Sequence, residues 1–204
     1  MTLQKGGLPI VTNNALWLAS ASPRRLALLE QIGVIPDHVV HANIDETPLK
    51  QELARDYAVR MAVEKSNHTR HQMPESEMDF VLTADTVVAV GRRILPKAET
   101  IDEARQCLKL LSGRAHRVYT AMCLTQGAVV RVKCVQTRVQ MKRLDATDLA
   151  WYIDTQDWKG KAGGYAIQGP AAAFIRNIQG SYSSVVGLPL YETANLLKGC
   201  GYRF

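Results

Sequence analysis

The chain has 204 residues and carries a formal net charge of +6 at pH 7. Hydrophobic residues make up 47% of it and charged residues 22%, which is typical of a globular protein and argues against intrinsic disorder. No run of 18 apolar residues occurs, so the sequence predicts no membrane-spanning helix. The length is that of one domain, and we expect a single domain over 1–204.

The N-terminus, the cysteines and the net charge bear on location and partners. Residues 1–14 hold one charged side chain and lack the apolar stretch of a secretory signal. The cysteines form no CxxC pair, which disfavours a zinc site or a disulfide framework and predicts a reducing, cytoplasmic location. The positive charge suits a polyanion or is only a solubilising surface. No basic run exceeds two residues, so nucleic acid is a disfavoured partner.

The first part of the chain predicts a strand, a tight loop and a helix. The apolar run 15–19 is typical of a buried strand. Ser22 and Pro23 are a typical N-cap and first helical residue, and Gly33 is a typical helix end. A second strand, a helix and a polar loop are then expected over 38–42, 51–69 and 71–79.

Asp85 interrupts an apolar stretch. The runs 80–84 and 86–90 predict strands on either side of it. Aspartate is a common turn residue, so one interpretation is a bend between two strands. The other is functional, because a carboxylate among apolar strand residues is costly unless it is paired, metal-bound or catalytic. Downstream, residues 100–103 have the form of a capping box and predict a helix that ends at 112–113.

The second half of the chain is rich in β-strand signals. Alternating runs over 115–125 and 128–141 predict a long hairpin, and a change of phase near Cys134 predicts a bulge there. The mixture of helices and hairpin strands predicts an α/β protein with a mixed sheet. A helix, a glycine-rich loop, a strand and a closing helix are expected over 146–154, 161–169, 171–178 and 188–198.

The segment 20–25, Ser-Ala-Ser-Pro-Arg-Arg, is a candidate anion site. A helix N-terminus presents unpaired N–H groups and a positive dipole end, and two hydroxyls with two guanidinium groups add donors that suit phosphate. The alternative is a capped helix with surface arginines.

Other charged residues are individually unspecific. The adjacent acids Asp45 and Glu46 supply the oxygen ligands that a divalent cation prefers, yet such a pair is more often a solvated loop. Taken alone, Lys65, Lys97 and the histidines are expected at the surface. No GxxxxGK[ST] motif occurs, and Ser22 lacks a histidine and an acid arranged for a hydrolase triad.

Together these segments resemble the Maf-like family of nucleoside triphosphate pyrophosphatases over nearly the whole chain, from 16 to 198. Each motif alone is weak, but their order and spacing are specific. The motifs are LASASPRR (18–25), DETP (45–48), EK (64–65), ADTVV (84–88), the lysine of LPKAET (95–100), KAGGYAIQG (161–169) and GSYSSVVGLPL (180–190).

The resemblance implies a fold and an activity. The implied fold is a long twisted mixed sheet flanked by helices, with two lobes around a central nucleotide cleft, related to inosine triphosphate pyrophosphatases. The implied activity is hydrolysis of dTTP and UTP to the monophosphate and pyrophosphate with a divalent cation, Mg²⁺ or Mn²⁺. It implies a house-cleaning role, a link to cell-division arrest, and a homodimer as one assembly the family uses.

The resemblance also implies roles for single residues. Asp85 matches the catalytic acid, and Glu46 matches a second acid that would bind the metal together with it. Lys97 is followed by alanine where the family often has proline, so the path of this loop is expected to differ. The residues that match substrate-binding positions are Ser20, Arg24, Arg25, Lys65, Thr86, Lys97 and Gln168.

Three of these positions, Arg24, Thr86 and Gln168, match those that tune base specificity. Their identities side with the dTTP/UTP subgroup rather than with a sister subgroup for 7-methyl-GTP. Two alternatives stay open: a non-catalytic nucleotide or nucleic-acid binding regulator of septum formation, and a pyrophosphatase for 7-methyl-GTP or inosine-type triphosphates.

Overall fold

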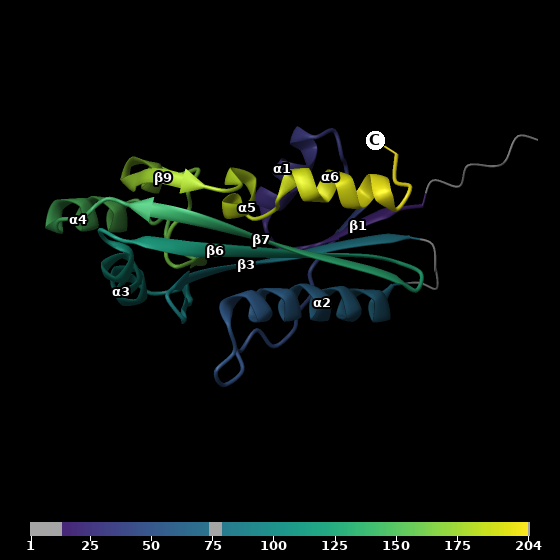
Figure 1. Cartoon of the computed structure of the whole chain (residues 1–204), viewed down its shortest axis with the longest axis horizontal. Helices are drawn as coiled ribbons and strands as arrows, with labels where there is room; N and C mark the ends of the chain where they lie inside the picture. Colours follow the sequence, from purple (N-terminus) through teal and green to yellow (C-terminus); the bar gives the residue numbers. More distant parts are fainter. Residues whose placement is uncertain (1–13, 74–78, 204) are drawn as a thin grey trace, which may run out of the picture.

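The computed structural model describes residues 14–73 and 79–203 (Figure 1). The N-terminal segment up to residue 13 and most of the loop expected over 71–79 lie outside the described residues. Within the described part, no helix is both long and apolar enough to cross a membrane.

A seven-stranded mixed sheet forms the centre of the molecule. Its strand order is β2-β1-β3-β6-β7-β9, with β4 also paired to β3. Strand β1 runs parallel to β2 and β3, whereas the neighbouring pairs β3–β6, β6–β7 and β7–β9 are antiparallel. A second, two-stranded sheet pairs β5 with β8. The strands are β1 (Leu16–Ala19), β2 (His38–Val40), β3 (Phe80–Val90), β4 (Arg93–Leu95), β5 (Lys97–Ala98), β6 (Ala115–Gln126), β7 (Val129–Met141), β8 (Lys161–Ala162) and β9 (Ile175–Gln179).

Helices cover both faces of the long strands, which confirms the expected mixed α/β architecture. Helix α2 runs along one face, α1, α5 and α6 lie over the other, and α3 and α4 lie toward the far end of the strands (Figure 1). The helices are α1 (Pro23–Gln31), α2 (Ala54–Gln72), α3 (Ile101–Leu111), α4 (Ala146–Asp154), α5 (Tyr182–Val186) and α6 (Leu190–Gly199), with a 3₁₀ helix over Pro170–Phe174.

Side chains that alternate along β3 contribute to two hydrophobic clusters, one on each face of the sheet. Leu82 and Ala84 pack in the cluster that contains α1 and α6, and Val87 and Ala89 pack in the cluster under α2. A third cluster, around α3 and α4, includes the fully buried side chains of Tyr152 and Phe174. Successive side chains of β3 therefore reach opposite faces of the sheet, which decides where its polar residues go.

One edge of β3 has a gap between its strand neighbours. Strand β1 pairs with β3 as far as Ala19 opposite Thr83, and β4 begins its pairing with Leu95 opposite Val88. Among the described residues, the four positions of β3 between these two strands have no strand partner on this side. Asp85 and Thr86 lie in this gap.

Asp85 does not bend the strand, so the expectation of two strands flanking it is wrong. Strand β3 is continuous, and Asp85 pairs with Ala121 of β6. The carboxylate is tolerated inside a strand because Lys65 neutralises it from α2.

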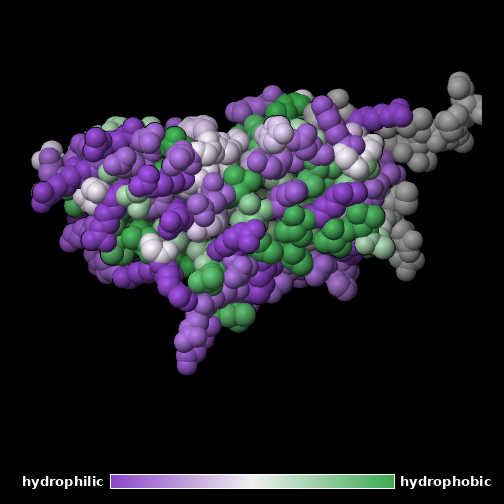
Figure 2. Space-filling view, in the orientation of Figure 1, coloured by the Kyte–Doolittle hydropathy of each residue, from purple (hydrophilic) through white to green (hydrophobic). Residues whose placement is uncertain are grey.

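The bulge expected near Cys134 is also absent, since Cys134 pairs in register with Ala121. The change of phase reflects burial: the first half of β7 is largely exposed and only the second half enters the core. Figure 2 shows apolar surface over this hairpin end of the sheet, where Val129 and Val130 are exposed. The register shift in β7 lies farther along, between Gln140 and Met141 opposite β9.

Two further expectations need correction. The strand expected over 171–178 begins as the 3₁₀ helix, because Pro170 starts a helical turn, and only β9 is extended. Not every histidine is at the surface: His116 is buried, and its Nε2 lies 2.7 Å from the hydroxyl of Tyr165.

Candidate active site

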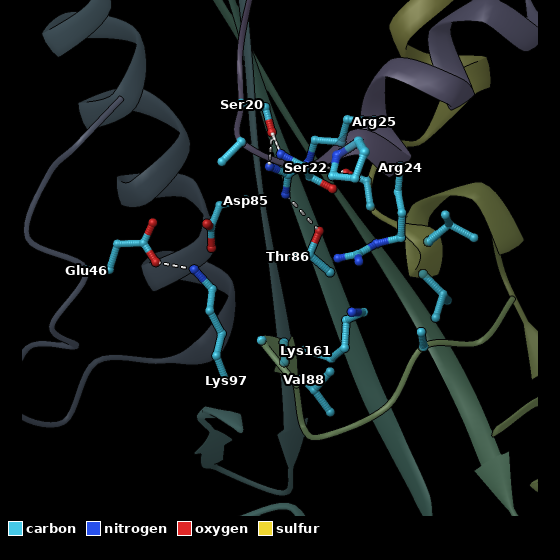
Figure 3. A pocket seen from close by; sticks show the side chains of 18 of the residues that line it. Ser20, Ser22, Arg24, Arg25, Glu46, Asp85, Thr86, Val88, Lys97 and Lys161 are labelled. Carbon is cyan, nitrogen blue, oxygen red and sulfur yellow. Dashed lines mark hydrogen bonds and ion pairs between the residues drawn. The ribbon is translucent and has the colours of Figure 1, made fainter. Parts of the chain in front are cut away.

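A cavity of about 350 Å³ opens at the gap in the sheet edge. Its walls come from the β1–α1 loop, β3, the β8 segment and the C-terminal end of α5 with Gly187 (Figure 3). All nine site residues predicted from the sequence line this one cavity: Ser20, Arg24, Arg25, Glu46, Lys65, Asp85, Thr86, Lys97 and Gln168.

Two carboxylates and a buried lysine form the polar centre of the cavity. The Lys65 ammonium lies 2.7 Å from Asp85 Oδ1 and 2.7 Å from Glu46 Oε1, and Lys97 Nζ binds the other oxygen of Glu46. Lys65 was expected at the surface when considered alone, yet it is only 7% exposed. Because Asp85 points to the α2 face of the sheet, it meets Lys65 there. Tyr57 donates a hydrogen bond of 2.6 Å to the carbonyl of Glu46 and fixes the loop that carries this acid.

The environment keeps Glu46 ionised. Burial would raise the pKa of Glu46, but the hydrogen bonds and charges of Lys65 and Lys97 together outweigh burial and lower it to about 2. At neutral pH the carboxyl is therefore an anion held between two ammonium groups.

Glu46 and Asp85 suit a divalent cation whose remaining ligands are water molecules and substrate phosphates. Glu46 and Asp85 offer carboxylate oxygens, the ligands that Mg²⁺ prefers. No group of three or more His, Cys, Asp and Glu side chains able to hold a metal occurs among the residues described. Mg²⁺ usually keeps several waters and binds through one or two carboxylates plus substrate phosphates, so a pair of acids suffices. Lys65 already places a positive charge between the two acids.

On the other face of the sheet, Arg25 ties three segments together. Its guanidinium donates to the carbonyl of Gly187 at 2.9 Å, to Ser20 Oγ at 2.9 Å and to Thr86 Oγ1 at 3.3 Å. Thr120 donates a further bond of 3.1 Å to Thr86. Burial lowers the pKa of Arg25, while the charge of the nearby Asp85 opposes this effect. With three of its nitrogens engaged by the protein, Arg25 holds the loop in shape and adds positive charge to it.

The neighbouring Arg24 extends into the cavity (Figure 3). It comes from the first turn of α1, and Gln168 comes from the loop after β8. Ser22 occupies the N-cap position as expected, but its side chain makes no capping bond; its N–H donates instead to Ser20 Oγ at 3.2 Å. The N-terminus of α1 and Arg24 thus face the cavity with donors suited to an anion.

Lys161 also lines the cavity and was not among the predicted site residues. Its ammonium donates to the carbonyl of Lys159 at 3.1 Å, and no carboxylate of the described residues lies within ion-pair distance. The only sequence signal was its place at the start of KAGGYAIQG. Gly163 allows this segment to approach β3, since a Cβ there would lie 2.9 Å from a methyl of Val88 and φ is +67°.

The cavity is strongly cationic. Among the described lining residues, five lysines and arginines face two carboxylates, a formal excess of three positive charges. A second cavity, of about 580 Å³, lies on the α2 side and shares Glu46, Asp85, Thr86 and Lys97 with the first. The carboxylates of Glu46 and Asp85 therefore lie where the two cavities meet, at the gap in the sheet edge.

Comparison with known proteins places this geometry in a family. The family model described as Maf-like protein matches residues 15–200. The chain belongs to this family. A dTTP/UTP pyrophosphatase of Caulobacter vibrioides is 56% identical over 190 residues, which cover 93% of this chain and 97% of that protein. A dTTP/UTP pyrophosphatase of Mesorhizobium japonicum is 52% identical and covers 92% of each chain.

A solved structure supports the fold. The structure of a HAM1 protein from Coxiella burnetii matches with a TM-score of 0.50 and 14% identity, covering 91% of this chain and 99% of that one. At this identity the match concerns the architecture alone.

Proposed function

We propose that this protein hydrolyses dTTP and UTP to the nucleoside monophosphate and pyrophosphate. The observation that carries the proposal is the Asp85–Lys65–Glu46 cluster, which lies where the cationic cavity meets the second cavity. The relatives that share more than half of its residues are named for this activity. A triphosphate carries about four negative charges at neutral pH, so charge neutralisation dominates its chemistry.

Asp85 is the proposed base. Its Oδ1 accepts the hydrogen bond from Lys65, whereas its other oxygen makes no hydrogen bond to the described residues and is available to a water molecule. As that water forms its bond to the α-phosphorus, its proton passes to Asp85 and the bond from the α-phosphorus to the bridging oxygen breaks. Pyrophosphate leaves with that oxygen.

The other groups bind and orient the substrate. Lys97 and Lys161 neutralise the phosphate chain, and Lys65 fixes the direction of the Asp85 carboxylate. A divalent cation, held by Glu46 and Asp85, would neutralise phosphate charge as the leaving group departs.

Base selection is assigned to Arg24 and Gln168, which both line the cavity. An amide offers one donor face and one acceptor face, which match a carbonyl and the neighbouring N–H of uracil or thymine. Cytosine presents an amino group and a bare ring nitrogen at the same positions, so it requires the opposite orientation of the amide.

The test is pyrophosphate release from dTTP and UTP in the presence of Mg²⁺. Asp85→Asn is expected to lower kcat by a factor of about 10² to 10⁴ while the protein stays folded. The matched control is Asp102→Asn, an exposed aspartate in α3, which is expected to leave the rate unchanged. A near wild-type rate for Asp85→Asn would refute the assignment. Nucleotide binding without any product from the wild type would favour a regulator that binds without catalysis.

A further inference from the structure

Asp157 lies outside the predicted site, in the turn between α4 and β8, and its backbone is firmly held. Its N–H donates to Thr155 Oγ1 at 3.2 Å. The preceding Gln156 has a φ of +55°, which is uncommon for a residue with a side chain. The following Trp158 is buried and donates a hydrogen bond of 2.9 Å to the carbonyl of Ile153. Strained backbone of this kind tends to be retained where a side chain must be aimed.

The carboxylate of Asp157 is aimed at the loop that carries Gln168. Its Oδ2 is buried and has no hydrogen-bond partner among the described residues. The same oxygen lies against Gly169, directly after Gln168: a Cβ built at position 169 would collide with Oδ2 and would lie 3.0 Å from Cγ. The φ of Gly169 is −100°, so the glycine is required there for space and not for its backbone conformation.

Arg24 lines the cavity and lies near enough for the charge of Asp157 to act on it. Burial lowers the pKa of Arg24, and the negative charge of Asp157 opposes that effect. No carboxylate of the described part of the chain forms an ion pair with Arg24, so its guanidinium stays available to a ligand. A buried carboxylate oxygen without a donor is costly, and a positive charge nearby lowers that cost.

We propose that Asp157 is a positioning residue for base selection: its carboxylate backs the Gln168–Gly169 turn and draws the Arg24 guanidinium toward the same end of the cavity. The two specificity positions come from segments more than 140 residues apart in the chain, and Asp157 fixes one against the other. This inference rests on the proposed function, in which Arg24 and Gln168 read the base.

Removal of the Asp157 charge is expected to change the relative kcat/KM values for different nucleotides. Asp157→Asn keeps the shape of the side chain and removes its charge, so the ratio of kcat/KM for UTP to kcat/KM for CTP is expected to fall roughly tenfold, within the range of coupling between interacting residues. kcat for UTP is expected to change much less, because Asp157 does not line the cavity. A merely structural role would lower activity on both nucleotides by the same factor and leave the ratio unchanged.

The experiment is a double-mutant cycle on the full chain. The wild type, Arg24→Ala, Asp157→Asn and the double variant are assayed with UTP and CTP, and thermal denaturation checks that each is folded. The double variant is expected to show the ranking of Arg24→Ala alone. Asp154→Asn, an exposed aspartate three residues upstream, is the matched control and is expected to change nothing.

Gly169→Ala provides a second, steric test that keeps the charge. Its methyl group displaces the carboxylate, so it is expected to shift the ranking in the same direction as Asp157→Asn, and to have no further effect in an Asp157→Ala background.

The outcomes separate the two proposals. If Arg24→Ala leaves the ranking unchanged, the base-reading role of Arg24 is wrong and this inference falls with it. If Arg24→Ala changes the ranking but Asp157→Asn does not, or does so additively, the inference about Asp157 is wrong and the proposed function stands.

Discussion

Replacing Lys65 with methionine tests how the centre of the site is held together. Lys65 and Asp85 are 7% and 5% exposed, and the lysine ammonium lies 2.7 Å from each of two carboxylates. Methionine fills a similar volume without a charge, so Lys65→Met leaves Asp85 without its ion-pair partner, whereas Glu46 keeps Lys97. Removing one partner of a buried ion pair costs about 3–5 kcal/mol, and we expect the free energy of unfolding to fall by that amount.

The loss of unfolding free energy in Lys65→Met is compared with the loss in Asp85→Asn. In that variant Lys65 keeps Glu46 as a partner, so the expected loss is only about 1–2 kcal/mol. In the double variant the asparagine is neutral, and part of the loss caused by Lys65→Met is expected to return.

Urea denaturation at pH 7.5 without divalent cations measures all four proteins. If Lys65→Met lies within about 1 kcal/mol of the wild type, or costs no more than Asp85→Asn, the argument that Lys65 neutralises a buried acid is refuted.

Three further predictions concern the buried His116, the cationic Lys161 in the cavity, and Gln168, which is proposed to recognise the nucleobase. Burial lowers the pKa of His116 from 6.5 to about 4. The unfolded chain therefore binds this proton first as the pH falls, and stability is lost between about pH 6.5 and 4, by at most about 3 kcal/mol. His116→Gln is expected to reduce the dependence of the free energy of unfolding on pH over this range, as measured by urea denaturation. An unchanged slope of that free energy against pH would contradict the prediction. Lys161→Met is expected to raise KM for dTTP about tenfold in steady-state kinetics, with Lys159→Met as an inert control; equal KM values would remove Lys161 from the substrate contacts. Gln168→Ala should reduce the preference for UTP over CTP about tenfold, and an equal loss on both would end its role in selection.

Elements with strong local signals could be predicted from the sequence. The capping box at Thr100 forms with both of its hydrogen bonds, and the helix expected over 146–154 has those bounds. Alternation also revealed the long β6–β7 hairpin. The short helix α5 was missed, because five residues carry too little periodicity to be recognised.

The site depended more on contacts between distant segments. Local chemistry could not show that Asp85 continues a strand, because the lysine that neutralises it stands 20 residues away on α2. The three hydrogen bonds of Arg25 likewise join segments up to 162 residues apart. The family resemblance selected residues that now line one cavity, while Lys161 and Asp157 became visible only through the packing around them.

The central claim is that a water aligned by Asp85 attacks the α-phosphorus, and an isotope measurement tests it directly. Hydrolysis of dTTP by the wild type in ¹⁸O-labelled water, followed by mass spectrometry of both products, locates the new bond. The account predicts that the label enters thymidine monophosphate and that pyrophosphate stays unlabelled. Label in pyrophosphate, or release of orthophosphate as the first product, would contradict it.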